Sequence, residues 1–276
     1  MDGLNLVKGA LLGLLEGIMG LTPLSARGHA LILERLSGQT LSGSDMLPFL
    51  TALRLGLIIA ALAGAFGPLV RALRHPLKGE LKWALISALP LAAVILIADS
   101  TGWLDTIEDS AFTLLPYALI FTAAVLFLAG RIAKNRRIAG TSRDRAGFKQ
   151  ATGVGLMQCL SVFTGASTVG MELTGALSSG LSSGGTAGFA YLCFVPALIV
   201  RSLPDAAEAI SSGAMKAALS ENGYVLLAGF VAAAVTGFIA VKLTQWLIRR
   251  ERTGWFSLYL VLLAAVVVAG TLSGKI

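Results

Sequence analysis

The stretch EGIMGLTPLSARGHALIL, residues 16–33, places three ionisable side chains in an otherwise apolar segment. Glu16 and His29 can accept and donate protons, and Arg27 carries the planar guanidinium that suits phosphate. Between Glu16 and Arg27, Pro23 and two glycines interrupt the apolar pattern. Because a charge inside hydrocarbon is costly, an ionisable residue there usually serves a function. This segment is therefore the first candidate for a site.

A second stretch, VFTGASTVGME at residues 162–172, interrupts another apolar segment and ends on the acid Glu172. Each interruption holds a serine, Ser25 or Ser167, and serine is a good N-cap for a helix that begins directly after it. The free N–H groups and the positive end of the dipole at such a helix start favour an anion, phosphate especially. Two helix starts and Arg27 therefore predict a phosphate site.

The composition indicates a membrane protein. The chain has 276 residues, of which 55% are hydrophobic and 13% charged, and its mean hydropathy is +0.79. A β-barrel is disfavoured because strict polar and apolar alternation is absent. The net charge of +7 does not indicate nucleic-acid binding, because the basic residues lie in short loops beside apolar segments. Six segments read as transmembrane helices: 47–70, 83–98, 112–130, 186–202, 222–248 and 255–273.

Loop charges orient these spans. The loops at 71–82, 131–149 and 249–252 are rich in lysine and arginine and are expected in the cytoplasm. The loop at 99–111 is acidic and is expected outside, as are both termini. His75, in the first of these loops, is expected on the surface.

Two apolar stretches remain, about 5–36 and 150–179. The second must enter the membrane from the cytoplasm and return there if the span at 186–202 is to run outward. We therefore expect a re-entrant helical hairpin at 150–179, and a second one, from the opposite face, at 5–36. Irregular backbone at that depth is tolerated only where protein or a cavity surrounds it.

An internal repeat supports this topology. Shifted by 142 positions, the first stretch aligns Glu16 with Gln158, Ser25 with Ser167 and Gly28 with Gly170. Each repeat, 1–138 and 139–276, would hold one hairpin and three spans within a single membrane domain. Three is odd, so the second copy is inverted. Inverted repeats with interrupted helices place a binding site near the midplane, between the copies.

Two further arginines leave alternatives open. Arg54 lies about two turns into the first span, and Arg201 lies near the outward end of its span. Both side chains can extend outward to the membrane surface, as long basic side chains do. They can instead line an outward vestibule for an anionic headgroup.

The two interrupted stretches resemble motifs of the bacterial undecaprenyl-diphosphate phosphatases of the bacitracin-resistance type. That family carries EGxTExxPxSSxGH, which here reads EGIMGLTPLSARGH, and PGxSRSGxT, which here reads TGASTVGME after the similar QCLSVF. The resemblance covers essentially the whole chain. The matching residues are Glu16, Pro23, Ser25, Gly28, His29, Gly165, Ser167 and Gly170.

The departures concern charged and hydroxyl positions. Gly20 stands where the family has its second glutamate, Ala26 replaces a serine, and Thr168 and Val169 replace the arginine and the serine of the second motif. Arg27 adds a cation to the first motif, and Glu172 adds an acid to the second. The charges look exchanged between the two hairpins, which favours a retuned anion site over the loss of one.

The resemblance implies hydrolysis of a polyprenyl diphosphate to the monophosphate in the bacterial plasma membrane, for recycling of the lipid carrier of envelope synthesis. A transporter or flippase of the same lipid is the alternative, since inverted repeats suit alternating access. The resemblance also implies Mg²⁺ or Ca²⁺, for which Glu16 is the one candidate ligand because Gly20 removes the other acid. Whether the chain acts alone or as a homodimer is left open.

The candidate residues fall into two groups. Expected in catalysis are Glu16, Ser25 and His29. Expected in substrate binding are Thr22, Arg27, Arg54, Gly165, Ser167, Thr168, Glu172 and Arg201.

Overall fold

The computed structural model describes residues 4–38, 41, 43–74 and 79–274, and this part of the chain is all helical, with no β-strand. A single β-bridge joins Arg143 and Leu181. His75 and Lys78, which the sequence places in a basic loop, lie outside the described residues. The helices are α1 (Leu6–Gly20), α2 (Ala26–Ser37), η1 (Ser44–Met46), α3 (Leu47–Gly64), α4 (Phe66–Arg74), α5 (Glu80–Ser100), α6 (Trp103–Asp109), α7 (Ala111–Ile138), α8 (Phe148–Cys159), η2 (Leu160–Val162), α9 (Thr168–Ser178), α10 (Ser183–Ser211), α11 (Ala214–Arg249) and α12 (Gly254–Leu272).

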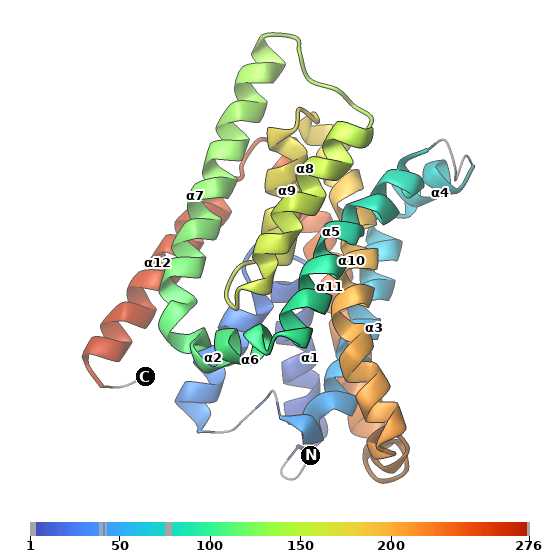
Figure 1. Cartoon of the computed structure of the whole chain (residues 1–276), viewed down its shortest axis with the longest axis vertical. Helices are drawn as coiled ribbons and strands as arrows, with labels where there is room; N and C mark the ends of the chain where they lie inside the picture. The colour runs from blue at the N-terminus through green and yellow to red at the C-terminus, as the bar shows by residue number, and fades with distance from the viewer. Residues whose placement is uncertain (1–3, 39–40, 42, 75–78, 275–276) are drawn as a thin grey trace.

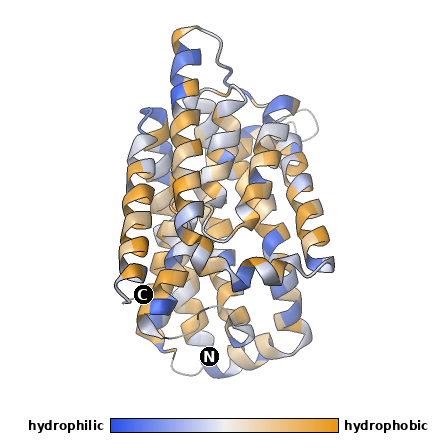
Figure 2. Cartoon of the chain, turned by 60° about the vertical axis from the view of Figure 1, so that its left-hand side comes forward, coloured by the Kyte–Doolittle hydropathy of each residue, from blue (hydrophilic) through white to orange (hydrophobic). Residues whose placement is uncertain are grey.

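Six of the described helices are long and apolar enough to span a membrane, as the sequence predicts. They are α3 together with η1, α5, α7, α10, α11 and α12. Their lengths, from 19 to 36 residues, cover the roughly 20 residues that a bilayer requires. Figure 2 shows long helices in which hydrophobic residues predominate, and many large hydrophobic side chains are exposed. The chain is therefore a multi-pass membrane protein.

The first predicted span, 47–70, is wrong at its end. Helix α3 ends at Gly64, and a separate helix α4 begins at Phe66. Pro68 explains the break, because proline has no N–H to donate to the carbonyl four residues earlier and its ring crowds that carbonyl. The freed oxygen of Gly64 instead accepts hydrogen bonds from Lys242 Nζ at 2.9 Å and Gln245 Nε2 at 3.4 Å, both on α11.

Four shorter helices form two pairs. Figure 1 shows α1 and α2 in the lower part of the molecule, near the N-terminus, and α8 and α9 in the upper part. Within each pair a short turn reverses the chain direction, at residues 21–25 and 163–167. Ser167 Oγ lies 3.4 Å from Thr22 O, so the two turns touch. Residues 142 positions apart in the sequence begin the second helix of each pair, Ala26 and Thr168.

Close packing on glycine fixes the position of α1. Gly9, Gly13 and Gly17 form a buried stripe at intervals of four residues, and this stripe faces α11. A Cβ atom on Gly13 would lie 2.3 Å from Gly229 O, so only glycine permits this approach. Small residues at such spacing are a common basis of helix packing in membranes. With this stripe against α11, Leu12, Leu15, Glu16 and Met19 line a cavity.

The basic loops gather at one end of the molecule. Figure 1 shows the carboxyl end of α7 and α4 at the top, and both termini at the lower end. Arg137, at the end of α7, forms an ion pair with Glu251 in the turn between α11 and α12, with Nε and Oε1 2.5 Å apart. The basic segments at 131–149 and 249–252 are therefore neighbours in space.

Candidate functional site

A cavity of about 480 Å³ lies where the two turns meet, bounded by α1, α3, α5, α6 and α10. Its wall is apolar over part of its area, with leucines from α1, α3 and α10 and Phe163 from the second turn. The polar and charged residues of the wall are Glu16, Ser25, Arg27, Arg54, Asp99, Glu108, Ser161, Thr164, Ser167, Thr168, Arg201 and Asp205. The polar part of this wall could contact a polar headgroup, and the apolar part could contact the start of an apolar chain.

Two helices begin at this cavity, each with a serine cap. Ser25 Oγ accepts a hydrogen bond from Gly28 N at 3.2 Å, and Ser167 Oγ accepts one from Gly170 N at 3.1 Å. The predicted caps are therefore confirmed. Ser25 adopts a positive φ of 69°, which is unusual for a residue with a side chain. Both helices direct the positive end of their dipole toward the cavity.

The turn of the first pair is anchored from two other helices. Tyr191, fully buried on α10, donates a hydrogen bond to Leu21 O at 2.8 Å, and Ser167 donates to Thr22 O at 3.4 Å. Thr22 itself is buried, and its hydroxyl donates to Ile18 O at 2.8 Å. Thr22 thus supports the turn through its backbone, and its side chain is not part of the cavity wall.

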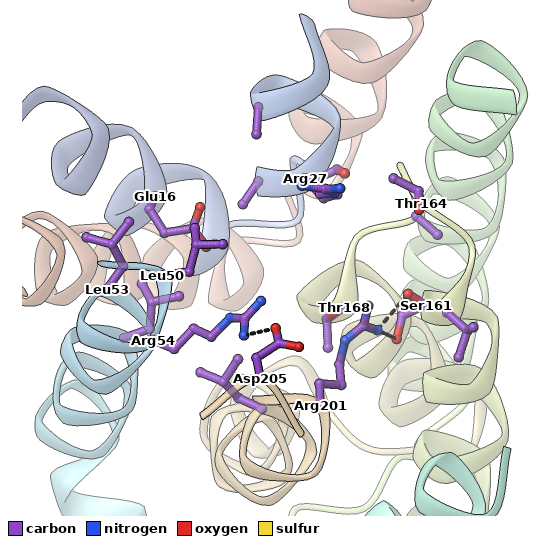
Figure 3. Close-up of a pocket in the computed structure, with 18 of the residues that line it drawn as sticks. Glu16, Arg27, Leu50, Leu53, Arg54, Ser161, Thr164, Thr168, Arg201 and Asp205 are labelled. Atoms are coloured by element: carbon purple, nitrogen blue, oxygen red, sulfur yellow. Dashed lines mark hydrogen bonds and ion pairs between the residues drawn. The ribbon is translucent and has the colours of Figure 1, made fainter. Parts of the chain in front are cut away.

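Three arginines from three different segments meet at the cavity. Figure 3 shows Arg27 from the start of α2, Arg54 from α3 and Arg201 from α10 around one space. Arg201 Nη1 donates to Ser161 O at 2.6 Å and to Ser161 Oγ at 2.9 Å. Arg54 Nη1 pairs with Asp205 Oδ2 at 2.5 Å. The cavity wall is therefore rich in guanidinium donors, which suit phosphate oxygens.

Of the predicted catalytic residues, the structure brings Glu16 and Ser25 to the cavity. Glu16 lies one turn before the end of α1 and points into the space that Figure 3 shows between Arg27 and Arg54. Its environment holds two positive charges, those of Arg54 and Arg27. A carboxylate at the wall of a cavity with several guanidinium donors can act as a proton acceptor.

Besides Thr22, two predicted residues do not reach the cavity wall. His29 faces α12, where its Nε2 lies 2.7 Å from Tyr259 Oη, while its Nδ1 lies 2.8 Å from Ser25 O. Glu172 is fully buried on α9, where its Oε1 accepts from Gln158 Nε2 on α8 at 2.8 Å. Gly165, Ser167 and Thr168, in contrast, do line the cavity.

The match to known proteins decides the family. The sequence model of the family described as "Bacitracin resistance protein BacA" matches residues 9–266. The chain belongs to the BacA family. Three relatives, each named "Undecaprenyl-diphosphatase", are similar over nearly their whole length. The protein from Carboxydothermus hydrogenoformans is 26% identical over 99% of this chain and 100% of its own. The protein from Geobacillus thermodenitrificans is 30% identical over 97% of this chain and 98% of its own. The protein from Bacillus subtilis is 25% identical over 96% of this chain and 97% of its own.

A resident metal ion does not fit the donors of this BacA-family cavity. Among the described residues, no group of three or more histidine, cysteine, aspartate or glutamate side chains could hold an ion. Asp205 pairs with Arg54, and Glu16 is close to two guanidinium charges. Mg²⁺ and Ca²⁺ need several oxygen ligands. Asp99 and Glu108 also line the cavity but form no such group with Glu16, so the donors are a poor site for either ion.

Sequence reasoning missed several residues of the cavity wall, among them Asp205 and Ser161. Asp205, the partner of Arg54, lies one helical turn after Arg201 on α10. Ser161, the partner of Arg201, lies in QCLSVF, a segment already noted for its likeness to the BacA family. The four-residue spacing from Arg201 to Asp205 was a usable signal, since residues at this spacing share a helix face.

Proposed function

We propose that this chain hydrolyses undecaprenyl diphosphate to the monophosphate within the membrane. The observation that carries the proposal is the arrangement of three guanidinium groups, two helix N-termini and the carboxylate of Glu16 around a single cavity. Membership of the BacA family and relatives named for this activity support the same reaction. The apolar part of the wall would accept the start of the prenyl chain.

Binding would combine the positive charge at the two turns with the arginines of α3 and α10. The diphosphate would lie between the start of α2 and the start of α9, where the free backbone N–H groups and Arg27 donate to its oxygens. Arg201, held by Ser161, and Arg54 would donate from the opposite side. Such fixed donors stabilise the negative charge that builds up on the leaving phosphate as the bond breaks.

The chemical step would be attack by water on the terminal phosphorus. An O–P bond forms to water, the bridging O–P bond breaks, and the proton of the water passes to Glu16. The lipid leaves as the monophosphate, with inorganic phosphate as the second product. The hydroxyl of Ser25 would donate to a phosphate oxygen, because its Oγ already accepts from Gly28 N. We assign no part in this step to His29 and Glu172, because neither lines the cavity.

We further propose the predicted topology, with re-entrant pairs at 5–36 and 150–179 in inverted repeats divided at residue 138. Helix α1 packs on α11, and α8 packs on α5. The offset of 142 positions that relates α1 to α8 also relates α5 to α11. This exchange of partners between halves is what inverted copies would produce. Basic loops in the cytoplasm and termini outside, in a bacterial plasma membrane, would then place the cavity toward the outer leaflet.

The transporter alternative is not favoured. The relatives carry the name of a hydrolase. The cavity also holds the carboxylate of Glu16 beside the hydrogen-bond donors that would bind phosphate, and binding alone does not need that carboxylate.

The proposed reaction is tested by phosphate release from undecaprenyl diphosphate in lipid nanodiscs, with the lipid product identified by mass spectrometry. The wild-type chain should release inorganic phosphate and yield the monophosphate. Glu16→Gln should lower the rate about 10²- to 10⁴-fold, the usual contribution of a positioned proton acceptor. Glu208→Gln, an exposed acid on α10 outside the cavity, is the control and should keep the wild-type rate. Absence of phosphate release from folded wild-type protein contradicts the proposal.

A further inference from the structure

The three cavity arginines are not equivalent. Arg201 bonds only neutral oxygen atoms, those of Ser161. Among the described residues, Arg27 has no ion-pair partner. In the described part of the chain, Arg54 is the one of the three that forms an ion pair, with Asp205. An anion that enters the cavity therefore meets two guanidinium groups without an ion-pair partner and one that already has such a partner.

The ion pair between Arg54 and Asp205 is accessible from the cavity. Both residues line the cavity wall, and their side chains are 26% and 35% exposed. The pair joins α3 to α10, and Figure 3 places it in the same space as Glu16, Arg27 and Arg201. A pair that is this exposed is weak, because water screens it. An anion with more charge and more acceptor oxygens can therefore displace the carboxylate.

We propose that Asp205 is an exchangeable counter-ion for Arg54, which the diphosphate displaces on binding and which returns to Arg54 when the product leaves. This inference rests on the proposed function for the identity of the anion. A diphosphate offers two phosphate groups to the guanidinium groups, and a phosphate accepts two parallel hydrogen bonds from one guanidinium. After cleavage the lipid keeps one phosphate, and Asp205 competes with it for Arg54.

Because Asp205 competes with phosphate for Arg54, it weakens the binding of anions and thereby speeds release of the product. Removal of the competing charge should tighten the binding of every anion that uses Arg54. A purely structural role for Asp205, as a link between α3 and α10, has the opposite consequence. Without that link the cavity would loosen, and anions would bind more weakly.

The test measures the binding of two farnesyl probes to purified protein in nanodiscs, the non-hydrolysable methylenediphosphonate and the monophosphate. Asp205→Asn should lower the dissociation constant of both probes by about two- to fivefold, the range expected for an exposed ion pair. The KM for the diphosphate substrate should fall by a similar factor. Asp205→Glu, which keeps the charge, should bind both probes as the wild type does.

Two further variants make the test specific. In an Arg54→Gln background, Asp205→Asn should have no effect on binding, because the competition requires both groups. Glu208→Gln removes the same charge from the same helix outside the cavity and should leave binding unchanged. Circular dichroism and gel filtration establish folding, and Asp205→Ala replaces Asp205→Asn if the latter does not fold.

Unchanged or weaker binding by the folded Asp205→Asn variant, or by Asp205→Ala where it replaces Asp205→Asn, overturns the inference, as does an equal effect in the Arg54→Gln background. These outcomes are independent of turnover, because the probes are not cleaved. Failure of the wild type to release phosphate contradicts the proposed function alone. Wild-type hydrolysis combined with weaker binding by Asp205→Asn contradicts the exchange alone.

Discussion

At the scale of residues, two serines occupy the same N-cap position, but their hydroxyl groups differ in the hydrogen bonds that they donate. Ser25 and Ser167 each accept a hydrogen bond from the amide three residues later. The Ser167 hydroxyl also donates to Thr22 O, whereas the Ser25 hydroxyl donates to no other described residue and can donate to a ligand in the cavity. Only Ser25 is therefore expected to bond phosphate directly.

Alanine at these positions separates the two roles. Ser167→Ala should cost about 1 kcal/mol of stability through the lost cap, with a modest loss of activity. Ser25→Ala should cost a similar amount of stability but should lower kcat/KM by a further ~10-fold, the effect of one hydrogen bond to a charged group. Thermal unfolding and phosphate release measure the two effects. Equal losses of activity would contradict a direct contact by Ser25, and loss of all turnover would make its hydroxyl the nucleophile.

The sequence could predict a site residue's type more readily than its direction. Glu16, Ser25 and Arg27 were expected at the site because charge and helix breaks are visible in the sequence. His29 follows Arg27 by two residues, which turns its side chain about 200° around the helix and away from the cavity. Glu172 lies about 6 Å along α9 from Thr168, where α8 covers it. Both placements depend on neighbouring helices that a local pattern does not reveal.

At the scale of elements, α1 depends on the close approach of Gly13 to Gly229. Gly13→Ala should destabilise the protein by about 1–3 kcal/mol, the usual cost of overpacking, because its Cβ would meet backbone atoms. The displaced helix would also carry Glu16 away from the cavity and lower phosphate release. The control is Gly223→Ala on α11, where a Cβ meets nothing within 4 Å. Thermal unfolding compares the two, and equal stability would show that this approach does not hold α1.

The break between α3 and α4 gives a second prediction for an element. Lys242→Met removes the shorter of the two hydrogen bonds to the carbonyl of Gly64. An under-bonded carbonyl inside a membrane should lower the free energy of unfolding by about 1–3 kcal/mol. Lys216→Met, at an exposed position on the same helix, should have little effect. Denaturant unfolding followed by circular dichroism checks both, and a stable Lys242 variant would contradict this account of the break.

Pro68 is plain in the sequence, yet the predicted span ran through it. The apolar pattern continues from 47 to 70, and hydropathy does not register the missing N–H of a proline. The six spans themselves were predictable, because about 20 apolar residues are needed in each. The ends of α10 and α11 were not, since these helices continue beyond the apolar segments that the sequence marks.

At the scale of the whole molecule, positive charge at the cavity comes from guanidinium groups on separate segments. This arrangement predicts that the protein alone holds no divalent cation tightly. Mg²⁺ or Ca²⁺ added to EDTA-treated protein should leave the melting temperature unchanged. If the protein had a resident site, an ion concentration of 100 times the dissociation constant would instead stabilise the fold by about 2.7 kcal/mol. A saturable rise in melting temperature that Glu16→Gln abolishes would contradict the prediction.

The central claim is that the two turns and the three arginines together hold a lipid diphosphate. The measurement that tests it most directly is a cryo-electron microscopy structure with farnesyl methylenediphosphonate bound. The account predicts both phosphorus atoms between the starts of α2 and α9, within hydrogen-bonding reach of Arg27, Arg54 and Arg201. A headgroup bound elsewhere, such as at the basic segments 131–149 and 249–252, would contradict it.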